Sequence, residues 1–309
     1  MIYIKTNIDE IVKKLEENNQ VIPATNDHIF KALFQDSEMR SLLSFIISEV
    51  TGINKDYVFE HMCFRNTELP KKNAFNKTNV TDLLVDIENM TISLEMNDEN
   101  GIDTYFRNSA HFHSLIVNSF DISDTYKDAG IVIQINFDNK HPFTKELISE
   151  IMLMDVLTGK VDEPNYKKYR INLSKAREKD YTNSKLTKFE RILLVMQEKN
   201  KDKLQKFAGK DEEIVKMADK IVKMSRNKKY VSLYDEEKLY RLSLSIAEKE
   251  MKKEATRKGL EEGMRQGIEQ GIEQNKCDMV KKMHDNNISI EVISNITGFS
   301  NEEIEKLIN

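Results

Sequence analysis

Two carboxylate side chains, Asp82 and Glu95, are spaced in the sequence so that they could bind one divalent cation. They belong to two segments of alternating residue type, 80–87 and 90–96, with a two-residue turn at 88–89 between them. Segments of this length joined by so short a turn predict a tight β-hairpin. Counting back from the turn sets the two carboxylates opposite each other on one face of the hairpin, about 5 Å apart at Cβ.

Two apposed carboxylates repel each other and raise each other's pKa unless a cation neutralises them. Mg²⁺ would do so, because it prefers oxygen ligands and is commonly held by one or two carboxylates together with phosphate oxygens and water. The opposite face of both segments is apolar and is expected to pack on helices; it carries Leu83, Val85, Ile87, Ile92, Leu94 and Met96. The alternative is an ordinary antiparallel strand pair, half exposed, whose acidic residues face water.

The order of these residues resembles a known nuclease motif. Asp82, a hairpin, and then Glu95 followed by an amide two residues later are similar to the motif of the PD-(D/E)xK nuclease superfamily. Within it, the chain resembles the PD-(D/E)xK nuclease family transposases, or Rpn-type recombination-promoting nucleases. Three further stretches agree with that branch: the phrase Asn-Asp-His-Ile-Phe-Lys-Ala-Leu-Phe at 26–34, the helical pattern around Arg107, and the glycine-periodic tail from Lys258.

This resemblance covers most of the chain and implies both a fold and an activity. The implied fold is α/β, with a restriction-endonuclease-like α-β-β-β-α-β core followed by an all-helical C-terminal region. The implied activity is Mg²⁺-dependent (or Mn²⁺-dependent) cleavage of DNA, with Asp82 and Glu95 as metal ligands and Asp27 as a third acidic group near the metal. At a helix start such as this one, an aspartate is also commonly only a cap.

The resemblance also implies roles for three polar residues around the metal. Asn97 stands where the broad superfamily has a lysine and where this branch often has glutamine, and it would help to place the attacking water. Arg107 and Lys31 are candidate phosphate contacts, and Lys31 lies one helical turn after Asp27, so the two should face the same way. The lysine-to-asparagine difference leaves a second hypothesis open, a catalytically lapsed nuclease-fold protein that acts in DNA binding or oligomeric assembly. For the endonuclease, the resemblance implies links to recombination, mobile elements or defence.

Composition sets limits on the class of protein. The chain has 309 residues, a net charge of −5, 39% hydrophobic and 32% charged residues, and no tryptophan, as soluble proteins rich in exposed helix do. The negative charge is not typical of a protein that simply coats nucleic acid. No run of about 20 apolar residues and no signal-peptide pattern occurs, so we expect a cytoplasmic protein without a membrane segment. Cys63 and Cys277 lie far apart without neighbouring ligands, which predicts neither a zinc site nor a disulfide.

The charge is distributed unevenly along the chain. Residues 165–210 contain fourteen lysines and arginines against five aspartates and glutamates. A surface that faces phosphate and an ordinary solvated set of helix faces both fit this pattern.

The elements that must position these residues follow from the spacing of apolar residues. We expect helices at 8–18, from Asn26 or Asp27 to Gly52, and after Gly101. Strands are expected at 57–64 and 131–137, with the core ending near Asn139. Further helices are expected at 185–198, 211–225 and 235–258, because the chain has no proline after Pro164.

The C-terminal part has two patterns of its own. Gly259, Gly263, Gly267 and Gly271 recur every fourth residue, each followed by an apolar residue, and so form a slowly winding stripe on a helix. Such a stripe favours either close packing in a homo-oligomer or a flexible connector. The end of the chain predicts a small helix-turn-helix-like module, with Ser300 and Glu303 as a capping box. We therefore predict four regions: a nuclease-like domain at 1–164, a helical and partly basic region at 165–257, the glycine-periodic segment at 258–276 and the terminal module at 277–309.

Overall fold

The computed structural model describes residues 7–66, 81–97, 102–119, 130–139, 146–181 and 185–308, and the chain divides into two compact units, Met1–Glu236 and Glu237–Asn309. The helices before the last strand are α1 (Ile8–Glu17), α2 (Asp27–Phe34), the short η1 (Ser37–Met39), α3 (Arg40–Thr51), α4 (Lys55–His61) and α5 (Ile102–Val117). The strands are β1 (Met62–Phe64), β2 (Leu83–Ile87), β3 (Met90–Asn97), β4 (Ile131–Asp138), β5 (Ile148–Ile151) and β6 (Tyr166–Asn172). The remaining helices are α6 (Leu173–Tyr181), α7 (Lys188–Gln197), α8 (Lys201–Ala208), α9 (Glu212–Met224), α10 (Lys228–Asp285), α11 (Ile290–Thr297) and α12 (Asn301–Ile308).

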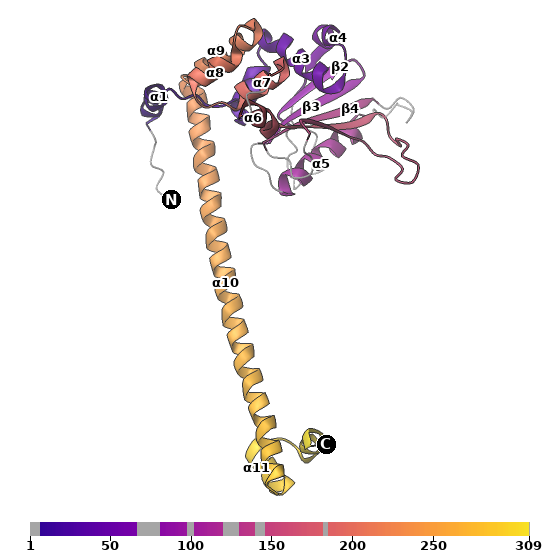
Figure 1. Ribbon diagram of the computed structural model, residues 1–309, viewed down its shortest axis with the longest axis vertical. Coiled ribbons are helices and arrows are strands. Elements are labelled where there is room, and N and C mark those ends of the chain that lie inside the picture. The colour runs from indigo at the N-terminus through magenta and orange to yellow at the C-terminus, as the bar shows by residue number, and fades with distance from the viewer. Residues whose placement is uncertain are drawn as a thin grey trace. The chain divides into compact units, whose positions relative to one another are not determined.

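The strands of the first unit form one mixed six-stranded sheet in the order β1-β2-β3-β4-β6-β5. Figure 1 labels β2, β3 and β4. β3, β4 and β6 are parallel neighbours, and the other pairs are antiparallel. The predicted α/β fold class is confirmed: a mixed sheet with flanking helices, followed by long C-terminal helices, is consistent with a restriction-endonuclease-like core.

The predicted hairpin is confirmed with its register. Ile87 pairs with Met90 beside the turn, and Leu83 pairs with Leu94 at the other end of the ladder. The next position along the ladder sets Asp82 against Glu95, as the alternation predicts.

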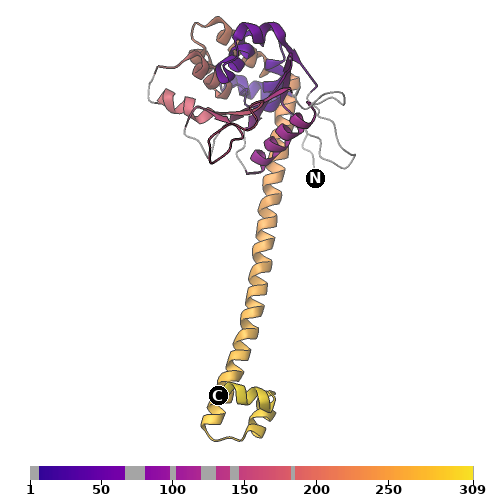
Figure 2. The same cartoon turned by 90° about the vertical axis from the view of Figure 1, so that its right-hand side faces the viewer.

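The two faces of the sheet differ in chemistry. The apolar face includes Phe137 and packs on α2, α3, α7 and α9, where Phe30 and Phe189 are among the largest buried side chains. α5 lies on the other side of the sheet (Figures 1 and 2). That second face is apolar only where Phe112 and Leu115 of α5 cover it, and elsewhere it is polar.

Two element predictions near the N-terminus are wrong in part. Most of the strand expected at 57–64 is the helix α4, because Asn54 caps it by accepting hydrogen bonds from two backbone N–H groups, and only Met62–Phe64 is a strand. The single helix expected from Asn26 to Gly52 is broken, since Asp36 caps a new helical turn after α2.

The expectation that the core ends near Asn139 is also wrong. β6 pairs in parallel with β4, and β5 then pairs with β6 at the edge of the sheet. The lysines and arginine of β6 conceal its alternation in the sequence, because three of its seven side chains are charged. The region expected to be helical from residue 165 therefore begins with a strand of the sheet.

The second unit has its own small core and confirms the terminal helices. Val280, Ile293 and Ile304 are buried together there. The backbone N–H of Ser300 donates to the Glu303 carboxylate, and the N–H of Glu303 donates to the Ser300 hydroxyl, which is the predicted capping box. The four-region division at 164, 257 and 276 stays a prediction.

Among the described residues, no helix combines the length and apolar character needed to cross a membrane. Cys63 and Cys277 are both free cysteines.

Candidate active site

Asp82 lies immediately before β2 and is held by two partners from different elements. Its Oδ2 atom accepts a hydrogen bond of 2.8 Å from the backbone N–H of Met96, in the neighbouring strand. Its Oδ1 atom lies 3.2 Å from the Lys31 ammonium, which comes from α2. The carboxylate is therefore fixed at the end of the hairpin, and one of its oxygens already faces a cation.

Glu95 is buried in β3, with only 2% of its surface exposed. Burial raises the pKa of Glu95 to about 7, and the charge of Asp82 acts in the same direction, whereas His111 and Arg107 oppose the shift. His111 Nδ1 lies 3.9 Å from Glu95 Oε1, which is too far for a hydrogen bond. Within the described part of the chain, Glu95 Oε1 has no hydrogen-bond partner.

The helix α2 brings Lys31 to this pair. Phe30 is buried and contacts the ring of Phe137 in β4, with ring centroids 5.6 Å apart, so α2 is anchored to the sheet beside the acidic residues. Asp27, one turn earlier, is the first residue of α2, and Asn26 caps the helix. No group of three or more histidine, cysteine, aspartate or glutamate side chains among the described residues is arranged to hold a metal ion. The role of Asp27 as a third ligand thus stays a prediction.

Both ends of the Asn97 side-chain amide are bonded within the protein. Its Nδ2 donates to Asp138 Oδ1 at 2.8 Å. Its Oδ1 accepts hydrogen bonds from Asn108 at 3.0 Å and from Arg107 at 3.3 Å, both in α5. Asn97 therefore joins three elements of the fold, β3, β4 and α5.

Asp138 and Arg170 belong to the same site but were not singled out from the sequence. The side chains form a buried pair, with Arg170 Nη1 3.3 Å from Asp138 Oδ2. The Arg170 guanidinium also lies over the ring of Tyr105 in α5, 4.7 Å from its centroid. Alternation along β4 places Asp138 on the polar face with Gln134 and would have suggested it. Its partnership with Asn97 depends on the parallel pairing of β3 with β4.

The space between α5 and the sheet contains more polar atoms than its hydrogen bonds satisfy. Asn108 donates to Asn136 at 2.9 Å as well as to Asn97, and Gln134 donates to the backbone carbonyl of Asn108. Among the described residues, the buried side-chain atoms without a partner include Ser93 Oγ, Glu95 Oε1, Asn108 Oδ1 and His111 Nδ1. Buried unpaired polar atoms in such a cluster indicate a place for water or an ion.

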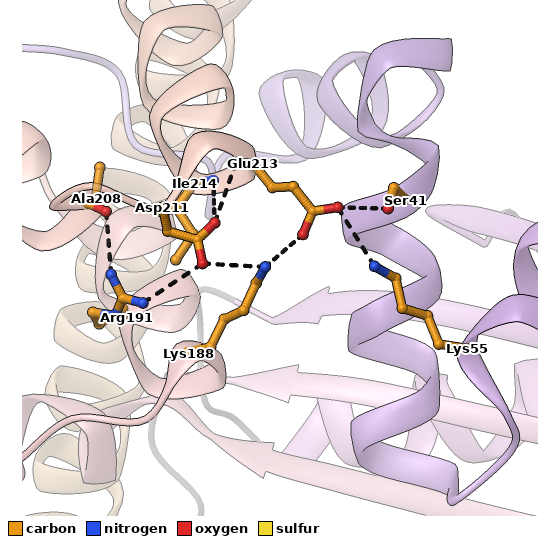
Figure 3. Close-up of polar contacts among 8 residues, drawn as sticks. All are labelled: Ser41, Lys55, Lys188, Arg191, Ala208, Asp211, Glu213 and Ile214. Carbon is orange, nitrogen blue, oxygen red and sulfur yellow. Dashed lines mark hydrogen bonds and ion pairs between the residues drawn. The ribbon is translucent and has the colours of Figure 1, made fainter.

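Much of the basic stretch 165–210 is engaged in ion pairs. Lys188 contacts Asp211 and Glu213, and Arg191 contacts Asp211, in a network between helices (Figure 3). In β6, burial lowers the pKa of Lys168 to about 8, and its ammonium donates to Ser109 of α5. These cations stabilise contacts inside the fold, so the count of lysines overstates the charge that is available to phosphate.

A family model described as PD-(D/E)XK nuclease family transposase matches residues 24–250, more than half of the chain. The matched range includes Asp82, Glu95 and Asp138, and it ends within α10 before the glycine repeat. Searches among curated proteins and among solved structures gave no match.

Proposed function

Because the chain belongs to the PD-(D/E)XK nuclease family transposases, we propose that it is a metal-dependent DNA endonuclease whose active site is the pair Asp82 and Glu95. The observation that carries the proposal is that the hairpin register sets these two carboxylates at adjacent strand positions, with one of them buried at a pKa near 7. A buried carboxylate with a raised pKa beside a second carboxylate is a typical feature of a functional site. The substrate class is DNA, in a process of recombination, element movement or defence.

The residues present fit Mg²⁺ or Mn²⁺. Asp82 and Glu95 offer hard oxygen donors, and Glu95 Oε1 is buried without a hydrogen-bond partner in the described residues. We propose these two side chains as the ligands, with Asp27 as a third acidic group. The chemistry that a bound Mg²⁺ supplies is activation of a water molecule and stabilisation of charge on the phosphate.

The protein's own cations would receive the DNA. We propose that Lys31 and Arg107 contact the phosphate on either side of the acidic pair: Lys31 already lies 3.2 Å from Asp82, and the charge of Arg107 acts on Glu95. Lys31 would exchange its contact with Asp82 for the phosphate. Both are charge-assisted contacts, which position a phosphate without reading sequence.

A second candidate function rests on Asn97. The superfamily places a cation two residues after the glutamate, whereas here that position holds an amide whose two ends are bonded to Asp138, Arg107 and Asn108. An amide engaged in this way is not available to place the attacking water. This observation favours a nuclease-fold protein that binds DNA without cutting it.

One experiment separates the two functions. Purified protein is incubated with supercoiled plasmid in Mg²⁺, in Mn²⁺ and in EDTA, beside Glu95→Gln, which keeps the size of the side chain and removes its charge. Nicking that needs metal and is lost in Glu95→Gln supports the endonuclease. If the wild type shifts the plasmid on a gel but never nicks it, the binding protein is the better description.

A further inference from the structure

On the polar face of the sheet, four side chains form a continuous polar connection from a buried ion pair to the solvent. Arg170 contacts Asp138 at 3.3 Å, Asp138 accepts from Asn97 at 2.8 Å, and Asn97 accepts from Arg107 at 3.3 Å. Asn97 and Asp138 are 2% and 4% exposed, whereas the side chain of Arg107 is exposed. The connection therefore begins at a buried ion pair and ends at a guanidinium that solvent can reach.

The charge of Asp138 determines which way the Asn97 amide points. An ionised carboxylate only accepts hydrogen bonds, so the NH₂ end of the amide must face it. The carbonyl end is then turned toward α5, where Arg107 and Asn108 donate to it. With a neutral amide at position 138, the Asn97 side chain could rotate and present its NH₂ group to the guanidinium, which accepts no hydrogen bond.

We propose that Asp138 is a positioning residue that acts through Asn97 to hold Arg107 beside the acidic pair, where it receives a DNA phosphate. The phosphate role rests on the proposed function, while the positioning concerns residues already in contact. Arg170 fixes the second oxygen of Asp138, so the carboxylate cannot turn away from Asn97. In this arrangement Asn97 does not act on water, and the cation that its position lacks is supplied by the neighbouring helix.

The test is a double-mutant cycle on DNA binding. Affinity for a fluorescent DNA duplex is measured by anisotropy in EDTA over a range of KCl concentrations, for wild type, Arg107→Ala, Asp138→Asn and the double variant. We expect each single change to weaken binding about three- to tenfold and to reduce the salt slope by about one, as loss of one phosphate contact does. The double variant should bind no more weakly than Arg107→Ala, because both changes remove the same contact.

The sign of the effect distinguishes positioning from general electrostatics. Asp138→Asn removes a negative charge, which by itself would strengthen binding to DNA. Asp162→Asn makes the same change of charge at an exposed residue outside the site and is the matched control. Weaker binding in Asp138→Asn together with equal or stronger binding in Asp162→Asn supports the proposal.

A second variant covers the case in which Asp138→Asn does not fold. Asn97→Ala keeps the Asp138 carboxylate and its pair with Arg170, and it removes the whole amide, including the acceptor of Arg107 and Asn108 and the donor to Asp138. It should show the same loss of affinity, and its loss should not add to that of Arg107→Ala. Additive losses, or binding by Asp138→Asn or Asn97→Ala as tight as wild type, would overturn the proposal. So would a wild type that binds no better than Arg107→Ala. A wild type that binds in this manner but never nicks plasmid overturns the endonuclease and leaves the positioning intact.

Discussion

At the scale of single residues, the site handles its two apposed acids in different ways. Asp82 lies close to Lys31 and accepts from a backbone N–H, whereas Glu95 is buried and its pKa is raised to about 7. A counter-charge therefore relieves the expected repulsion at Asp82, whereas at Glu95 burial and the neighbouring charge raise the pKa and so favour the protonated form. This difference makes two properties of the site testable.

The first is the pH dependence of metal binding. Since the pKa of Glu95 is raised to about 7, a proton competes with the metal below that pH. We expect Mn²⁺ affinity, measured by titration calorimetry, to rise about tenfold per pH unit up to pH 7 and then to level off. Because His111 lowers the pKa of Glu95, His111→Asn should move the break to higher pH. Affinity that is flat between pH 5.5 and about 7 would contradict this account of Glu95.

The second is the contrast between two substitutions of Asp82. Asp82→Ala leaves the N–H of Met96 without its acceptor, and we expect it to lower the free energy of unfolding by about 1 to 3 kcal/mol. Asp82→Asn keeps an acceptor oxygen, so its loss of stability should be smaller, while metal-dependent nicking is lost in both. Urea unfolding and plasmid nicking together check the prediction, which is wrong if the two variants are equally stable or if either still nicks at the wild-type rate.

At the scale of elements, an ion-pair network joins the helices on the apolar side of the sheet (Figure 3). Glu213 at the start of α9 contacts Lys188 of α7, Ser41 of α3 and Lys55 of α4, and Asp211 caps α9 next to it. Burial by itself would raise the pKa of Glu213, but the hydrogen bonds from Lys188 and Ser41 outweigh it and hold the pKa at about 2.

This network predicts how stability depends on acid. A carboxylate whose pKa is lower in the folded state than in the unfolded state stabilises the fold above the unfolded value and loses that contribution as pH falls through the folded one. For Glu213 this window runs from 4.5 down to about 2. At pH 7 we expect Glu213→Gln to have a lower melting temperature than the wild type. At pH 2 to 3 the two melting temperatures should be nearly equal. Glu212 is exposed and lies next to Glu213 in the sequence, so Glu212→Gln is the control. If both changes lower the melting temperature equally at pH 7, Glu213 has no special role.

At the scale of the whole molecule, the glycine stripe of α10 is the feature that the nuclease-like unit does not explain. Apart from its chain neighbours and the nearby backbone of the same helix, a Cβ atom added at Gly259, Gly263, Gly267 or Gly271 would meet no atom of the described residues within 4 Å. The adjacent Leu260, Met264, Ile268 and Ile272 are all exposed. Within the described residues nothing packs on this stripe, so close packing in a homo-oligomer and a flexible connector both stay predictions.

Replacing the four glycines by alanine distinguishes these two alternatives. Each change should favour the helix by up to about 1 kcal/mol and causes no clash within one chain. If two copies pack closely along the stripe, the added methyl groups will weaken association, so helicity measured by circular dichroism rises while the mass measured by light scattering falls. An unchanged mass would leave the stripe as a connector. Plasmid nicking should be the same in both proteins, because the proposed ligands lie outside this helix.

The residue pattern within one short segment of the sequence determined the central hairpin. Its alternation and its two-residue turn specify which residues share a face, because strand side chains alternate and the turn sets the register. The opposition of Asp82 and Glu95 follows from those two facts, and the structure has the same register. Lys31 was expected near the acids only through resemblance to a family, since nothing in residues 26–34 alone states what that helix packs against.

Tertiary structure alone decided the rest of the site. Asp138 meets Asn97 because β4 pairs in parallel with β3, and Arg170 meets Asp138 because β6 then pairs with β4. Parallel neighbours are joined by long crossovers, so no turn specifies their register, and burial against α2 and α5 selects it instead. A water-placing role for Asn97 was implied by resemblance to a family, from its position two residues after Glu95, and it stays a prediction. In the structure, the amide donates to the carboxylate of Asp138, 41 residues away, and accepts from Arg107, and these contacts depend on the pairing of β3 with β4 and on the packing of α5.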